Sequence, residues 1–425
     1  MSNETKRLNV LIHGLGSLGT AIINSISKSP LIGKIYVVGI TRRKNIPSNI
    51  EYLGCGKDLK ISDLKNIIKE KNIDFAISFY EIYTIKGLID FYINELKIPI
   101  IGCPQGWFDL EYSKLSCKEF MNRNGIKTAD FLQIFNKNDI KYAIEKFGLP
   151  LVIKNNYLEA GFGSHICETK SECENIANKL LKSYDFCLAE KYITGEEITQ
   201  QYIWDKENII PLNPVKDFKK AKINNKEINT GGLASYTPVS LTETQINQLE
   251  DLNNNLSKIF KSFKPNFTSI FALNLMFTNS GLYTLEFNMR PGITEFETII
   301  ENLDCDLLEI LWKTVNSDLK CDDIKYKDGK STTVALAHKN YLRQKKGKHY
   351  RKIKFNTIQK DKDSSINLNF NIVDILNEKE LLINESQRFL SINCTDKNNP
   401  TEKIFDYIKQ IDNKGFYHIN KEDII

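Results

Sequence analysis

The stretch Leu285-Glu286-Phe287-Asn288-Met289-Arg290 decides how this chain is interpreted. Its pattern predicts a buried strand, and because strand side chains alternate between faces, Glu286, Asn288 and Arg290 share one face. A carboxylate and an amide oxygen two residues apart suit a hard cation such as Mg²⁺, and the arginine adds a positive fork for phosphate or carboxylate. The combination favours phosphoryl transfer, in which catalysis is mostly positioning and charge neutralisation. A strand edge with a solvated polar face is the alternative, and the rest of the chain has to decide.

The composition is that of an ordinary soluble globular protein. The 425 residues are 41% hydrophobic and 26% charged, and this length predicts two to four domains. A net charge of +5 is small for the length, so a nucleic-acid partner is not expected. Nine cysteines, an odd number without a CxxC pair, favour a reducing compartment. Neither a signal peptide nor a membrane span is predicted, and we expect a cytoplasmic protein with no membrane partner.

The first hundred residues predict an open α/β domain. Strands are expected at 8–12, 35–40, 73–78 and 98–102, with a helix over 86–96. Gly14 and Gly16 open a GxGxxG turn before a helix that runs to about Ser27, where backbone N–H groups can hold an anion. With the basic run Thr41-Arg42-Arg43-Lys44 after the second strand, this turn leaves an NADP-binding oxidoreductase as an alternative. The motif alone is a weak signal, because any tight strand-to-helix turn favours glycine.

Beyond Ser113 the pattern suggests nucleotide binding. A helix is predicted over 113–124, a strand over 131–135 and a helix over 140–147. The short apolar strand 151–154 ends in Lys154, and a lysine there is costly unless an anion meets it. Gly161 and Gly163 lie in a short loop whose backbone could approach a phosphate, although a simple hairpin turn is the alternative.

Further polar positions follow a strand expected at 186–189. Glu190 could accept a hydrogen bond from an adenine amino group, and Glu197 could hold ribose hydroxyls. Strands are predicted at 199–204, 209–212, 269–277 and 282–288, with a loop over 229–238 and helices over 245–260 and 303–315. After a polar linker near 324–330, strands at 332–337, 381–383 and 389–393 and a helix over 401–411 predict a small α+β domain.

Five ordered segments resemble the ATP-grasp superfamily, most closely the glycinamide ribonucleotide synthetase family. They are LEYSKLSCKEFMNRNGIKTADF (110–131), GLPLVIK (148–154), AEKYITGEE (189–197), NTGGLASYTP (229–238) and LEFNMRPG (285–292). The resemblance covers residues 8 to about 315. It implies an α/β fold with a Rossmann-like domain over 1–110, an ATP-grasp domain over 111–322 whose lid spans about 127–193, and a C-terminal α+β domain over 323–425.

The family makes an acyl phosphate from a carboxylic acid and ATP and then lets an amine attack it. The resemblance therefore implies ATP, Mg²⁺ (or Mn²⁺), small-molecule acid and amine partners, and a monomer or homodimer. Its nucleotide positions are Lys114, Lys154, Gly161, Gly163, Glu190, the backbone at Lys191 and Ile193, and Glu197. Its metal ligands are Glu286 and Asn288, and its catalytic positions are Arg290, Asp217, Lys219 and Lys220. Its substrate positions are Gly14, Gly16, Asn229, Thr230, Gly231, Gly232 and Glu295.

Departures from the family fall mostly at substrate positions. The first turn has Ser17-Leu18-Gly19 where the family carries Arg, Glu and His, and the C-terminal Gly-Gly-Tyr-Pro segment is His338-Lys339-Asn340-Tyr341. Phe162 replaces a lid lysine, Phe218 and Lys220 alter an Asp-His-Lys-Arg run, and Ile293-Thr294 replaces Asp-Pro. This pattern predicts a ligase with a changed acid or amine. A divergent but genuine synthetase is the alternative, and a non-catalytic module is disfavoured because a dead site has no physical reason to retain buried charges.

Overall fold

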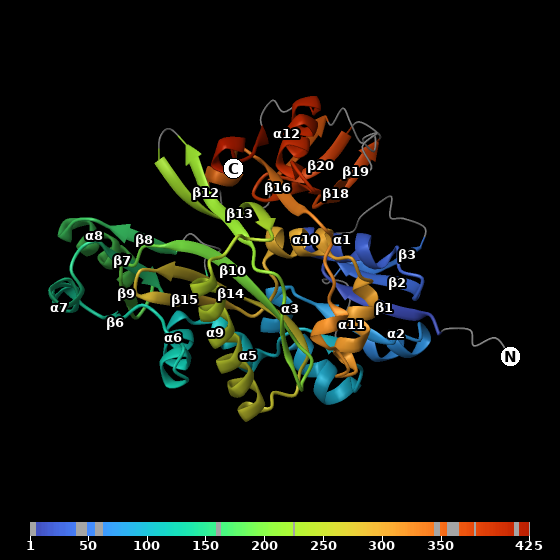
Figure 1. Ribbon diagram of the computed structural model, residues 1–425, viewed down its shortest axis with the longest axis horizontal. Helices are drawn as coiled ribbons and strands as arrows, with labels where there is room; N and C mark the ends of the chain where they lie inside the picture. Colours follow the sequence, from blue (N-terminus) through green and yellow to red (C-terminus); the bar gives the residue numbers. More distant parts are fainter. Residues whose placement is uncertain are drawn as a thin grey trace.

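The computed structural model describes residues 6–39, 49–55, 63–158, 163–223, 226–343, 349–354, 365–377, 380–411 and 416–424. The strands in these ranges form one parallel sheet near the N-terminus and four antiparallel sheets. Figure 1 shows the N-terminal part in blue on one side, a teal and green lobe on the other, and the C-terminal strands in red above them. Among the described helices, none combines the length and the apolar character that a membrane span requires.

The N-terminal sheet confirms the predicted open α/β domain. Its strands are β1 (Leu8–His13), β2 (Ile32–Gly39), β3 (Ile50–Cys55), β4 (Phe75–Ser78) and β5 (Ile100–Ile101), in the order β3-β2-β1-β4-β5. Helices α1 (Ser17–Ile26) and α2 (Leu64–Glu70) connect them. Val10, Leu11 and Ile12 are buried on both faces of the sheet, as expected of a covered parallel strand. Strand β3 was not predicted, because its sequence IEYLGC is short and mostly half-buried.

The helix predicted over 86–96 is divided in the structure. Its range is occupied by α4 (Leu88–Phe91) and the π-helical segment η2 (Tyr92–Leu96), and a further short helix, α3 (Glu81–Ile85), precedes it. Gly87 separates α3 from α4 with a φ of +74°, a left-handed conformation that glycine adopts without strain.

The lobe on the opposite side is a small antiparallel sheet with two helices. Its strands β6 (Phe131–Ile134), β7 (Leu151–Asn155), β8 (Ser164–Cys167) and β9 (Cys187–Lys191) lie in the order β6-β9-β7-β8. Helices α7 (Lys137–Phe147) and α8 (Lys170–Leu181) begin with capping boxes at Asn136 and Thr169, which fix their first turns. Because β7 and β8 pair directly, the predicted glycine loop connects the two strands of a hairpin.

A second antiparallel sheet carries the stretch that ends in Arg290. Its strands β10 (Glu196–Trp204), β11 (Ile209–Pro211), β14 (Ser269–Thr278) and β15 (Gly281–Asn288) have the order β11-β10-β14-β15. Helices α5 (Gln105–Tyr112), α6 (Lys114–Arg123) and α9 (Glu243–Phe263) share a core with this sheet, in which Phe260 stacks on Phe271 at 5.3 Å. The strand predicted over 282–288 is confirmed by β15, although the register shifts at Leu285. The expectation that the strand continues to Arg290 is wrong, because β15 ends at Asn288.

The predicted loop over 229–238 is also wrong, because these residues form a strand. Strands β12 (Lys216–Ile223) and β13 (Lys226–Thr237) pair, and β13 continues onto β16 (Lys330–His338), β21 (Arg388–Asp396) and β18 (Ile366–Phe370). Strand β22 (Phe416–Tyr417) adds to β16, and α12 (Pro400–Gln410) packs on the sheet. A three-stranded sheet of β17 (Tyr350–Lys354), β20 (Glu380–Asn384) and β19 (Asp374–Asn377) lies beside it. The six-stranded sheet formed by β12, β13, β16, β21, β18 and β22 contains residues from both sides of position 323, where the predicted C-terminal domain begins. The domain boundaries stay predictions.

Two helices connect the sheets. Helix α10 (Ile293–Asn302) was not predicted, and α11 (Leu307–Val315) starts four residues later than the helix expected at 303. Phe296 and Leu308 from these helices join Ile12 in one apolar core. Helix α10 contacts α1 on one side and β13 on the other (Figure 1). The end of β15 and the N-terminal glycine turn line one cavity.

Candidate active site

One cavity of about 570 Å³ gathers most of the predicted site residues. It extends from the lobe sheet, past the end of β15, to the glycine turn before α1. The predicted residues that line it are Gly14, Gly16, Lys114, Lys154, Gly163, Glu190, Lys219, Thr230, Gly231, Glu286, Asn288, Arg290 and Glu295. Those that do not line it are Lys191, Ile193, Glu197, Asp217, Lys220, Asn229 and Gly232. Gly161 and the basic run Thr41–Lys44 lie outside the described residues.

The first group in the cavity is a buried cluster centred on Glu190. Its Oε2 atom lies 2.9 Å from Lys154 Nζ and 3.0 Å from Lys118 Nζ. Burial alone would raise the pKa of Glu190, but the two ammonium groups hold it below its ordinary value. Burial lowers the pKa of Lys118, which also donates to Thr128 Oγ1 at 2.9 Å. Glu190 Oε1 accepts no hydrogen bond from the described residues, so one oxygen stays available as an acceptor beside the cavity.

Lys118 was missed at the sequence level. It lies one helical turn after Lys114, on the buried face of α6, and its side chain is 2% exposed. The sequence did contain a signal for Lys118: it lies four residues after Lys114, inside the segment 110–131 that resembles the ATP-grasp superfamily.

Lys114 is held in place by contacts with the backbone immediately after β7. Its Nζ donates to Tyr157 O at 2.9 Å, and its backbone N–H donates to Asn156 O at 2.9 Å. Ser113 caps α6 by accepting from the backbone N–H of Ser116. The cap and these contacts place the Lys114 ammonium beside the loop that connects β7 and β8.

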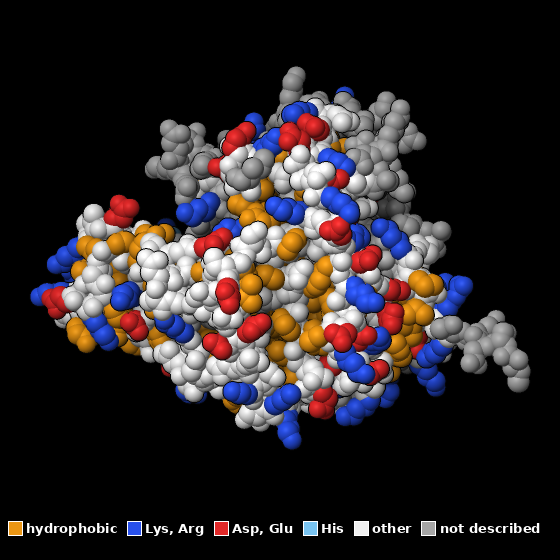
Figure 2. Space-filling model, in the orientation of Figure 1, with side chains coloured by type: hydrophobic (Ala, Val, Ile, Leu, Met, Phe, Trp, Pro, Cys, Tyr) orange, Lys and Arg blue, Asp and Glu red, His pale blue; other side chains and the backbone are white. Residues whose placement is uncertain are grey.

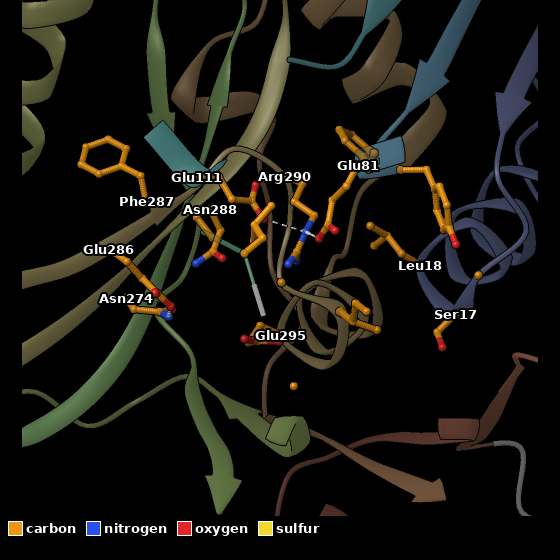
Figure 3. A pocket seen from close by; sticks show the side chains of 18 of the residues that line it. Ser17, Leu18, Glu81, Glu111, Asn274, Glu286, Phe287, Asn288, Arg290 and Glu295 are labelled. Atoms are coloured by element: carbon orange, nitrogen blue, oxygen red, sulfur yellow. Dashed lines mark hydrogen bonds and ion pairs between the residues drawn. The ribbon is translucent and has the colours of Figure 1, made fainter. Parts of the chain in front are cut away.

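The face of β15 that was expected to bind metal lines the cavity. Figure 3 shows Glu286 and Asn288 on one side of the strand, with Phe287 on the other. Asn274 on β14 pairs with Glu286 and donates from Nδ2 to Glu286 Oε1 at 2.6 Å. Thr199 Oγ1 in turn donates to Asn274 Oδ1 at 3.1 Å. Mg²⁺ commonly takes one or two protein oxygen ligands together with substrate phosphates, and this pair fits that pattern.

A second charge cluster lies at the base of β12. Lys219 Nζ is 2.9 Å from Glu197 Oε1 and 3.0 Å from Asp217 Oδ2. Burial would lower the pKa of Lys219, yet the two carboxylates raise it well above its ordinary value. Burial raises the pKa of Asp217 to about 6. Of these three only Lys219 lines the cavity, and Lys220 is exposed.

Arg290 is fixed by two carboxylates that the sequence did not reveal. Its Nε lies 2.9 Å from Glu81 Oε1 and 3.1 Å from Glu111 Oε1 (Figure 3). Burial opposes the charge of Arg290, but Glu111 and Glu81 raise its pKa above the ordinary arginine value. Glu111 lies within the segment 110–131, whereas no sequence pattern marked Glu81.

The far end of the cavity combines the α1 turn with the C-terminal sheet. Helix α1 starts after Gly16 without a side-chain cap, and Ser17 and Leu18 line the cavity there. Arg388 also lines it, and its guanidinium donates to Gly232 O at 2.6 Å and to Gly231 O. Tyr341 Oη accepts from the backbone N–H of Gly231 at 3.2 Å. Arg388 was missed, because only the pairing of β13 with the C-terminal strands brings it to this site.

Known proteins share this sequence and fold. Residues 112–296 match the family described as phosphoribosylglycinamide synthetase, ATP-grasp (A) domain. A phosphoribosylamine–glycine ligase of Fusobacterium nucleatum subsp. nucleatum is 32% identical over 345 residues, which are 79% of each chain. Another from Clostridium acetobutylicum is 28% identical over 349 residues, covering 79% of this chain and 81% of the relative. The crystal structure of a phosphoribosylamine–glycine ligase from Thermotoga maritima has a TM-score of 0.78 at 20% identity, covering 97% of this chain and 99% of that one.

The family match covers all or part of the five ligase segments, and the comparisons give no support to the NADP-binding oxidoreductase. The likeness to the Thermotoga structure confirms the fold. At 32% identity over 79% of both chains, the sequence establishes the family. The chain belongs to the phosphoribosylglycinamide synthetase family of ATP-grasp ligases, which form C–N bonds with ATP and Mg²⁺.

Proposed function

We propose that this chain is an ADP-forming ligase that joins glycine to phosphoribosylamine, the reaction named for its relatives. The observation that carries the proposal is the single cavity described above. It has Glu190 at one end and the α1 turn with Arg388 at the other, and Glu286, Asn288 and Arg290 lie between. A ligase needs this order, because the phosphate transferred from ATP has to meet the acid before the amine arrives.

The nucleotide end has the groups that ATP requires. The unused oxygen of Glu190 suits an adenine amino group, and Lys154 and Lys114 supply positive charge for phosphates. Glu286 and Asn288 would hold Mg²⁺, which neutralises charge on the phosphates when bound. Gly163 at the hairpin lets backbone approach the nucleotide without a side chain in the way.

The reaction proceeds in two balanced steps. A carboxylate oxygen of the acid attacks the γ-phosphorus, the bond to the β–γ bridging oxygen breaks, and ADP leaves. The amine nitrogen then attacks the acyl carbon, the acyl–phosphate bond breaks, and the amine loses a proton as inorganic phosphate leaves. Arg290 is the cation placed to stabilise negative charge on the acyl phosphate, because its guanidinium offers paired N–H donors.

Hydrogen-bond donors at the α1 end of the cavity take the place of the first-turn arginine, which the family carries and this chain lacks. A dianionic sugar phosphate needs several donors, usually backbone N–H groups at a helix start together with a basic side chain. The uncapped start of α1, the Ser17 hydroxyl and Arg388 are all present in this one cavity. These groups support an anionic amine substrate.

A changed acid or amine is the second candidate, and a charge imbalance favours it. Three carboxylates, Glu81, Glu111 and Glu295, line the cavity together with Arg290 and Arg388. Since two of them contact Arg290, their negative charge would oppose a dianionic substrate and suit a neutral or cationic one.

An ADP-release assay separates the two candidates. Purified protein with Mg²⁺ and ATP is given glycine with phosphoribosylamine, and in parallel a panel of other amino acids and amines, with mass spectrometry of each product. Glycine-dependent ADP release with phosphoribosylamine, and growth rescue of a purine auxotroph that lacks the glycine ligase, are expected. Turnover only with another pair would replace the proposal by the second candidate, because unpaired groups in a pocket penalise a wrong substrate heavily.

A further inference from the structure

Glu111 makes two contacts that converge on the end of the metal-binding strand. Its Oε2 accepts from the backbone N–H of Met289 at 2.7 Å, and its Oε1 lies 3.1 Å from Arg290 Nε. The side chain comes from α5 and is 2% exposed. A single buried carboxylate therefore fixes both the main chain and the side chain of consecutive residues.

These contacts matter because Arg290 lies beyond the support of the sheet. The last ladder pair of β15 joins Asn288 to Ala272, and the strand ends there. Glu81 also contacts Arg290, but its side chain is 40% exposed, so water competes for that contact. Glu111 is thus the buried group that holds the chain immediately after Asn288.

Glu111 also connects two parts of the site. It lies three residues before Lys114, in the short α5–α6 segment whose second helix starts with that lysine. We infer that Glu111 is a positioning residue, which sets the Arg290 guanidinium relative to Glu286, Asn288 and Lys114. This inference rests on the proposed function for its kinetic test, and it has a second test that does not.

The kinetic test compares Glu111→Gln with Asp109→Asn at pH 8. Burial raises the pKa of Glu111 to about 7, so the carboxylate is ionised under these conditions. The amide keeps an acceptor for Met289 and loses the charge that holds Arg290, so we expect kcat to fall about 100-fold, as for a misplaced catalytic group, with ATP affinity unchanged. Asp109 is exposed on the same helix and should leave kcat unaltered. An unchanged kcat in Glu111→Gln, or a loss explained entirely by weaker ATP binding, would overturn the inference.

A double-mutant cycle with Arg290→Lys makes the assignment specific. Lysine keeps the charge at position 290 but lacks the planar fork that Glu111 orients. If Glu111 acts through Arg290, adding Glu111→Gln to Arg290→Lys should lower kcat little further. Additive losses would show that Glu111 acts on something else.

The second test measures the Arg290 Nε–H directly by ¹⁵N NMR, with Arg290→Lys used to assign the signal. Arg290 Nε–H donates to Glu81 Oε1 at 2.9 Å, and the buried Glu111 carboxylate 3.1 Å away holds the guanidinium in that position. Exchange of this proton with water should be about tenfold faster in Glu111→Gln, since the charge that holds the guanidinium is lost. It should be unchanged in Asp109→Asn. If wild-type protein releases no ADP with any substrate pair, the proposed function fails while this exchange rate still decides the role of Glu111. Equal exchange in both variants would reduce Glu111 to a structural residue.

Discussion

Lys154 and Glu190 form a buried ion pair in which Nζ donates to Oε2 over 2.9 Å. The same oxygen is 3.0 Å from Lys118, so two cations share one carboxylate. Lys154 lines the cavity and is 16% exposed, whereas Lys118 is 2% exposed and bonded to Thr128. Lys154 can therefore bind a nucleotide phosphate while Lys118 remains the ion-pair partner of Glu190. Two predictions follow from this difference between the lysines.

Lys154→Ala should weaken ATP binding without unfolding the protein. Glu190 keeps Lys118 as its partner, and the lost contact with phosphate is a charge-assisted hydrogen bond, so the Kd of ATP should rise about tenfold or more. Calorimetry measures the Kd, and Lys179→Ala, an exposed lysine on α8, is the control. An unchanged Kd would remove Lys154 from the nucleotide site.

Glu190→Ala should destabilise the fold strongly. Without this carboxylate, Lys118 loses its counter-ion inside the protein, and breaking a buried pair in this way costs about 3–5 kcal/mol. Thermal unfolding should show a clearly lower midpoint. The double variant Glu190→Ala with Lys118→Met should recover much of that loss, because the unpaired charge is gone. Equal midpoints for wild type and Glu190→Ala would contradict a buried, structurally necessary pair.

The elements that could be predicted are those whose sequence pattern is local. Strand β1 is a short apolar run followed by glycine, and β14 and β15 are two such runs around a turn at Asn279-Ser280-Gly281. The strand β13 was missed because its residues are polar and contain Gly231-Gly232. It is a strand because it pairs with β16, about a hundred residues later, and Gly232 takes a φ of +94° inside it.

The residues of the site also divide into those that a local sequence pattern predicts and those that only tertiary packing brings to the cavity. Glu286 and Asn288 could be predicted because two residues on one strand share a face whatever the rest of the chain does. Glu81 and Arg388 could not, because α3 and the start of β21 reach the cavity only through tertiary packing. The surface gave no further guide: Figure 2 shows basic and acidic side chains interspersed over the face that is drawn.

Glu286→Gln should abolish Mg²⁺-dependent ATP turnover while the fold survives. The amide keeps the size of the side chain, and its carbonyl oxygen can accept the hydrogen bond that Asn274 Nδ2 donates to Glu286. The charge that would hold Mg²⁺ between phosphates is lost. ADP release measured across a Mg²⁺ titration should stay near background at every concentration. Full Mg²⁺-dependent release would show that this face of β15 does not bind the metal.

As the control for that variant, Glu301→Gln changes a carboxylate that lies outside the cavity. Glu301 accepts from Asn367 at 3.0 Å and does not line the site around β15. Its Mg²⁺ dependence should match that of the wild type. A loss in both variants would point to a general effect on the fold.

Glu297→Gln should stabilise the protein at alkaline pH and have little effect at acidic pH. Glu297 on α10 is 1% exposed, and burial raises its pKa from 4.5 to about 7, with Ser391 and Arg388 offsetting only part of the rise. Between these two values the folded protein keeps a proton that the unfolded chain has released. Stability therefore falls as pH rises through this window, and above about pH 7 the full penalty, on the order of 3 kcal/mol, is present. Glutamine cannot ionise, so the variant should unfold at a higher temperature than wild type at pH 8 and at a similar one at pH 5.

The exposed carboxylate Glu119 provides the control, because Glu119→Gln should show no such pH-dependent gain. A gain of equal size at both pH values would mean that the amide improves packing and that the charge of Glu297 is not the cause.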